Sequence, residues 1–92
     1  MPYLLKKDKE NVTDNGGLEL ENYYSKLSAQ DFAGHINYLN FWLVKNWIKK
    51  NGKRYWICAL ITGTLICCVL EIYRRIIAPY EDEKIKSSGD VE

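Results

Sequence analysis

The side chains that could perform chemistry in this 92-residue chain are few and far apart. His35 is the single histidine, so a histidine-rich metal site is excluded. The three cysteines, Cys58, Cys67 and Cys68, fall inside one apolar run, which leaves no Cys–His pair for nucleophilic catalysis. The sequence also contains no Gly-rich phosphate loop and no Gly-x-Ser-x-Gly turn. We therefore expect a protein that is not an enzyme and uses no cofactor, metal or small-molecule substrate.

The acidic residues divide into surface acids and one acid at the end of the apolar run. The surface acids are Glu19, Glu21, Glu81, Asp82 and Glu83. A catalytic carboxylate pair would need a pocket, which so short a chain does not build alone. Glu71 differs, because an acid near a membrane is costly and often functional. Arg74 and Arg75 follow it at the spacing of helical ion pairs, which favours a local ion pair of Glu71 with Arg75 over a proton relay.

The apolar run covers residues 56–70 and contains no charge, no proline and no strongly polar side chain. Tyr55 and Trp56 stand at its start, and Tyr73 precedes Arg74 and Arg75 at its end. Aromatic rings at both ends and basic residues at the exit are typical of a bilayer crossing. A helix over residues 55–73 covers about 27 Å, close to the hydrocarbon thickness. We predict a single transmembrane helix over residues 55–77, within a segment bounded by residues 53 and 78, rather than the buried helix of a small soluble domain.

Within this helix, small side chains recur once per turn at Ala59, Gly63 and Cys67. Such a pattern forms a shallow groove that lets another helix approach closely, and it also arises by chance in passive anchors. Both interpretations stay open. The cysteines are interpreted as small hydrophobic residues, and acylation of Cys67 or Cys68 is the alternative.

The segment before the apolar run predicts a second helix over residues 28–50. Ser28 and Asp31 form a capping-box pattern at its start, and Asn51-Gly52 is a typical helix end. Between them an apolar stripe recurs at helical spacing, with Trp42 at its edge; its residues are Phe32, Ile36, Leu39, Leu43 and Trp47. Phe41 and Ile48 interrupt the polar side. The pattern predicts an amphipathic helix.

Aromatic and basic residues crowd both ends of the predicted span, which suggests a membrane interface. They are Trp42, Trp47, Lys49, Lys50, Lys53, Arg54, Tyr55, Trp56, Tyr73, Arg74 and Arg75. A helix lying at the headgroup level before turning into the bilayer explains this set, and so does packing against a larger protein. The expected partners are therefore the lipid bilayer and a larger membrane-protein complex.

The sequence thus predicts an all-α membrane protein, an amphipathic interfacial helix followed by one transmembrane helix, with disordered or partner-ordered tails. Its parts are a flexible arm (residues 1–17), an amphipathic helical segment (18–52), the transmembrane helix (53–78) and a polar tail (79–92). The net charge of +1 argues against a nucleic-acid binder.

Two functions from different classes fit this organisation. The first is a non-catalytic accessory subunit that stabilises or assembles a larger membrane complex. Its build is similar in architecture, without a shared motif, to single-span supernumerary subunits of respiratory-chain complexes. The second is a tail-anchored adaptor or regulator that recruits a soluble partner or modulates a transporter through residues 18–50. The mitochondrial inner membrane is the favoured location and the endoplasmic reticulum the second. A small channel-forming oligomer is disfavoured, since the span has no polar stripe beyond Thr62 and Thr64.

Overall fold

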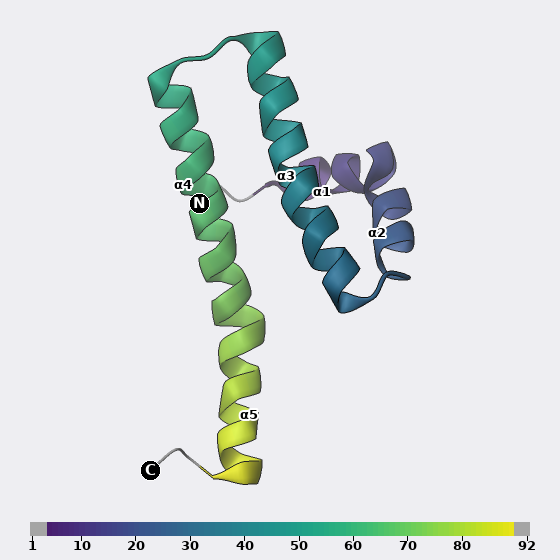
Figure 1. The fold of residues 1–92 in the computed structure, drawn as a ribbon, viewed down its shortest axis with the longest axis vertical. Helices are drawn as coiled ribbons and strands as arrows, with labels where there is room; N and C mark the ends of the chain where they lie inside the picture. The colour runs from purple at the N-terminus through teal and green to yellow at the C-terminus, as the bar shows by residue number, and fades with distance from the viewer. Residues whose placement is uncertain (1–3, 90–92) are drawn as a thin grey trace. The chain divides into compact units, whose positions relative to one another are not determined.

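The structure, a computed structural model, describes residues 4–89, and this part of the chain is helical with no strand. The all-α prediction is therefore confirmed. Five α-helices and two π-helical turns follow one another (Figure 1). They are α1 (Lys6–Val12), η1 (Thr13–Gly17), α2 (Leu18–Tyr24), α3 (Ala29–Asn51), α4 (Tyr55–Ile72), η2 (Tyr73–Ile77) and α5 (Ala78–Ser88). The described residues form two compact units, 4–53 and 54–89.

Helix α3 begins and ends where its sequence signals predict. The Ser28 hydroxyl accepts a hydrogen bond from the Asp31 backbone N–H at 3.2 Å, which satisfies one of the free amides of the first turn. At the other end Gly52 has φ 105°, a conformation that favours glycine, and its N–H donates to the Ile48 carbonyl at 2.7 Å. Lys49 and Lys50 lie in the last turn, where positive charge is favourable.

Helix α2 packs against the first half of α3. The spacing of apolar residues in 18–27 fits both a strand and a helix, and the structure shows a helix over Leu18–Tyr24. The Tyr24 ring lies 6.1 Å from Phe32 and 5.6 Å from His35, both in edge-on geometry. Tyr23 also approaches His35, at 6.0 Å. Edge-on ring pairs of this kind stabilise a contact beyond the area they bury. The single histidine of the chain is thus part of the packing between α2 and α3.

The N-terminal segment differs from the flexible arm expected for residues 1–17, because α1 occupies Lys6–Val12. The Asn15-Gly16 break is present as a kink, with Gly16 at φ 108°. Local side chains compensate for the kink: Thr13 Oγ1 donates to the Lys9 carbonyl at 3.1 Å, and Asn15 Nδ2 donates to the Asn11 carbonyl at 2.7 Å. These two bonds pair the carbonyls of Lys9 and Asn11 in the last turn of α1. Residues 1–3 lie outside the described part.

The expected extended tail after Pro79 also needs correction, since one helix continues over Tyr55–Ser88, 34 residues (Figure 1). A proline inside a helix lacks its N–H and collides with the preceding turn. Here η2 widens that turn: the Ala78 N–H donates to the Tyr73 carbonyl, five residues back. Pro79 then stands in the first turn of α5, where a missing N–H is tolerated. The helix ends at Gly89, whose N–H donates to the Ile85 carbonyl at 2.9 Å, and residues 90–92 lie outside the described part.

Candidate functional site

Within residues 4–89, the helix that starts at Tyr55 is the one that is long and apolar enough to cross a membrane. Its most apolar 18-residue window has a mean hydropathy of 2.0. The α4 portion has 18 residues and therefore rises about 27 Å, close to the thickness of a bilayer's hydrocarbon core. Large apolar side chains along it are exposed, with Leu60 at 57%, Val69 at 64% and Leu70 at 60%. Helix α4 therefore presents an apolar surface that needs a cover.

A shallow groove lies on α4 at the small residues Ala59 and Gly63. Four further side chains form its walls: Tyr55, Cys58, Thr62 and Ile66. Apart from the adjacent residues and the backbone of its own helix, no atom lies within 4 Å of the point where a Cβ on Gly63 would stand, so the missing side chain leaves open space. The lining ends at Ile66, and Cys67, predicted as the third small residue of this face, lies outside it.

The two threonines of the span have different surroundings. Thr64 Oγ1 donates to the Leu60 carbonyl of its own helix at 2.8 Å, so its hydroxyl is satisfied within α4. Thr62 instead lines the groove beside Ala59 and Gly63. A hydroxyl in that position is suited to a hydrogen bond across a helix–helix contact.

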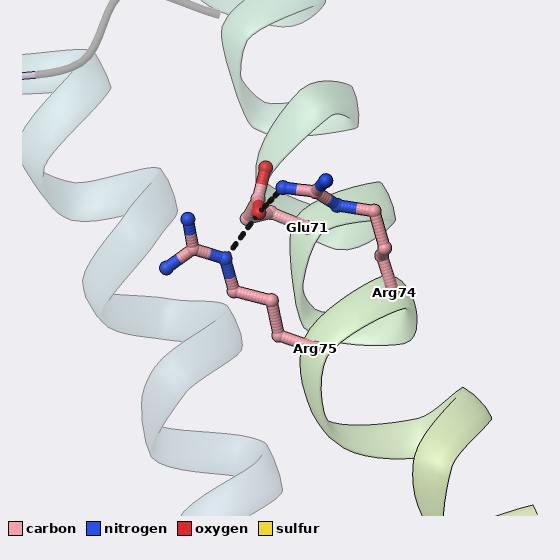
Figure 2. Close-up of polar contacts among 3 residues, drawn as sticks. All are labelled: Glu71, Arg74 and Arg75. Carbon is pink, nitrogen blue, oxygen red and sulfur yellow. Dashed lines mark hydrogen bonds and ion pairs between the residues drawn. The ribbon is translucent and has the colours of Figure 1, made fainter.

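Glu71 is held by both arginines that follow it (Figure 2). Its Oε1 lies 2.5 Å from Arg74 Nη2 and 2.6 Å from Arg75 Nε. The Glu71 side chain is 20% exposed, whereas those of Arg74 and Arg75 are 67% and 64% exposed. The carboxylate is thus neutralised at the end of the apolar segment while the guanidinium groups reach outward. This geometry matches a local ion pair better than a proton-relay acid.

The residues predicted for the membrane interface lie on four consecutive segments. Trp42, Trp47, Lys49 and Lys50 are on α3, Lys53 and Arg54 are in the connection, Tyr55 and Trp56 begin α4, and Tyr73, Arg74 and Arg75 are in η2. The rings at both ends of α4 are exposed: Tyr55 at 91%, Trp56 at 63% and Tyr73 at 48%. The two aromatic ends are separated by the length of α4, as a membrane span requires.

One surface was not predicted from the sequence, a groove at the C-terminal half of α3 that is lined by both apolar and lysine side chains. It is lined by Phe41, Val44, Lys45, Ile48, Lys49 and Lys53. The signal was present in the spacing, because Phe41, Val44 and Ile48 stand at i, i+3 and i+7. Treating Phe41 and Ile48 as interruptions of a polar side concealed this second apolar face.

The described residues contain no group of three or more histidine, cysteine or acidic side chains that could hold a metal ion.

The geometry defines a small all-helical protein with one helix of membrane-spanning length. The chain belongs to the family described as a domain of unknown function, DUF6899, whose sequence profile matches residues 1–91. Neither the curated proteins nor the solved structures gave a match to this chain.

Proposed function

We propose that this protein is a non-catalytic, single-span accessory subunit that stabilises or assembles a larger membrane complex. The observation that carries the proposal is the groove at Ala59 and Gly63 in the middle of an exposed apolar helix of bilayer length. Lipid covers an apolar helix without requiring such a groove. A groove that admits a second helix backbone adds close packing, which is the main source of affinity between helices in a bilayer.

In this role α4 crosses the membrane, and the residues on either side of it contact the partner subunits. The respiratory chain of the mitochondrial inner membrane is the favoured setting and the endoplasmic reticulum the second. The paired charges of Glu71 with Arg74 and Arg75 mark the point where the helix leaves the hydrocarbon, because basic side chains there reach the headgroups.

A second candidate is a membrane-anchored adaptor that acts without a fixed complex. An apolar concavity between α2 and α3 favours it, since it offers a recognition surface on the unit outside the span. It is lined mainly by Leu20, Tyr24, Leu27, Phe32 and Leu39. Such a surface suits an apolar anchor from a soluble protein.

Native gel electrophoresis of gently solubilised membranes tests both candidates. An accessory subunit migrates in one sharp band of high mass with constant partners. A low-mass or smeared species contradicts that role and favours the adaptor. Alkaline carbonate extraction of the same membranes provides the control for α4, because a chain released into the supernatant does not span the bilayer.

A further inference from the structure

The groove on α3 lined by Phe41, Val44, Lys45, Ile48, Lys49 and Lys53, the lysine groove, faces away from α2. Helix α2 contacts α3 through Phe32 and His35. With 3.6 residues per turn, Phe41, Val44 and Ile48 lie on roughly the opposite side of the helix. Phe41 is 64% exposed, and Val44 and Ile48 are half-buried. Helix α2 therefore does not cover this apolar face, and Phe41 is its most exposed side chain.

The charge of the lysine groove has no acidic counterpart nearby in the chain. No aspartate or glutamate occurs between Asp31 and Glu71. Within residues 4–89 the ion pairs are those of Glu71, and none involves Lys45, Lys49 or Lys53. Three ammonium groups, spaced four residues apart, thus line one side of an apolar floor. This surface is complementary to a ligand that is anionic at one end and apolar at the other.

We propose that the lysine groove binds an acidic phospholipid. The phosphate lies among Lys45, Lys49 and Lys53, and an acyl chain lies along Phe41, Val44 and Ile48. Lys53 precedes the first residue of α4 by two positions, so a membrane-embedded α4 brings it to the depth of the headgroups. The proposal rests on the proposed membrane insertion of α4 and is independent of the accessory role.

Lys50 provides a matched control within the same cationic cluster. It follows Lys49 directly and also lies in the last turn of α3, but it points about 100° away around the helix and does not line the groove. If lipid binding were only diffuse attraction to an anionic surface, replacing Lys49 or Lys50 would weaken it equally. If a headgroup is bound in the groove, replacing Lys49 weakens binding more than replacing Lys50.

The test is native mass spectrometry of the full chain in a neutral detergent, titrated with phosphatidylglycerol or phosphatidylcholine. We expect phosphatidylglycerol to bind more tightly than phosphatidylcholine by about 10-fold or more, because only phosphatidylglycerol carries a net negative charge that the lysines attract. Lys49→Gln should weaken that binding about fivefold, since a contact between exposed opposite charges contributes up to about 1 kcal/mol. Lys50→Gln should weaken it much less, because Lys50 does not line the groove. Replacing Lys45, Lys49 and Lys53 together by glutamine should reduce it on the order of 100-fold. Circular dichroism of each variant verifies that α3 remains helical.

Two soluble probes identify the alternatives. Glycerol phosphate carries the headgroup without acyl chains, and if it binds as tightly as phosphatidylglycerol the lipid proposal is overturned. A poly-glutamate peptide that displaces the lipid at equal concentration indicates an acidic protein partner instead. Equal losses in Lys49→Gln and Lys50→Gln also overturn the proposal. A chain that binds phosphatidylglycerol as predicted but migrates as a low-mass species refutes only the accessory role.

Discussion

The Nε atom of Arg75 lies 2.6 Å from Oε1 of Glu71, one helical turn before it, and Arg74 approaches the same oxygen (Figure 2). The acid therefore stands at the end of the apolar segment as part of a local group of three charges. Because both partners lie on the same helix, the group forms without any other part of the chain. It allows a carboxylate to remain beside an apolar surface at modest cost.

Replacing Glu71 by glutamine should lower the free energy of unfolding of this helix by less than about 1 kcal/mol, because helical ion pairs with exposed partners are individually weak. Denaturant titration followed by circular dichroism measures the change. Glu81→Gln on α5 is the control that removes one carboxylate elsewhere on the same helix. A loss of several kcal/mol in Glu71→Gln alone would mean that the acid has a role beyond this pair.

Replacing Gly63 by leucine should fill the α4 groove and reduce co-purification with partner subunits by about 10-fold, equivalent to about 1.4 kcal/mol. Open space around Gly63 means that the helix itself accommodates the larger side chain. The control, Cys68→Leu, places the same leucine side chain outside the groove lining and should leave co-purification unchanged. Quantitative blotting after native gel electrophoresis measures both. Equal effects in the two variants would contradict packing through this face.

Replacing Ser28 by alanine should destabilise α3 by about 1 kcal/mol, since it removes the acceptor for the Asp31 amide. The loss should be visible as a lower thermal midpoint by circular dichroism. Ser87→Ala, near the end of α5, removes a hydroxyl that bonds within its own turn and should change the midpoint much less. Similar shifts in both variants would indicate that the capping bond contributes little.

Replacing Gly17 by alanine should destabilise the N-terminal unit, because a Cβ there would stand 2.6 Å from the Val12 carbonyl oxygen. The backbone of η1 must shift to relieve that contact. Gly34→Ala is the opposite case, because Gly34 lies inside α3 and a Cβ there would meet no atom within 4 Å beyond the adjacent residues and the backbone of its own helix. This substitution should stabilise the helix by about 0.5–1 kcal/mol. Thermal unfolding of the two variants should shift in opposite directions. A shift in the same direction would contradict the close approach at Gly17.

Local signals were sufficient to predict α3 and the start of α4. Ser28 and Asp31 fix one end of α3, and Gly52 fixes the other through a backbone conformation that few other residues adopt. The aromatic pair Tyr55 and Trp56 coincides with the first turn of α4. In each case the determinant lies within a few residues of the boundary, so the sequence alone contains it.

The structure differs from the sequence-based prediction where a neighbouring turn compensates for a residue that normally ends a helix. Pro79 is a reliable helix breaker in isolation, and a π-helical turn just before it removes the conflict. The spacing of apolar residues in 73–77 does not predict a π-helical turn. Likewise, the side chains of Thr13 and Asn15 bond to carbonyls of α1 and stabilise its end. The composition of residues 1–17 predicts a flexible chain and does not reveal these bonds. The lysine groove was not predicted for another reason. The side of α3 that contains Phe41 and Ile48 was interpreted as polar throughout, although these two residues form part of an apolar floor.

The continuity of α4 with α5 gives the proposed membrane protein a fixed reach. From Tyr73 to Ser88 the helix rises about 24 Å, which places the acids Glu81, Asp82 and Glu83 at set heights above the headgroups. Distance from the bilayer and azimuth around the helix axis are thereby linked, so removing four residues would lower the acids by about 6 Å and turn them by about 40°. In the proposed accessory role, the length of this helical segment would determine the height above the bilayer at which it contacts a neighbouring subunit.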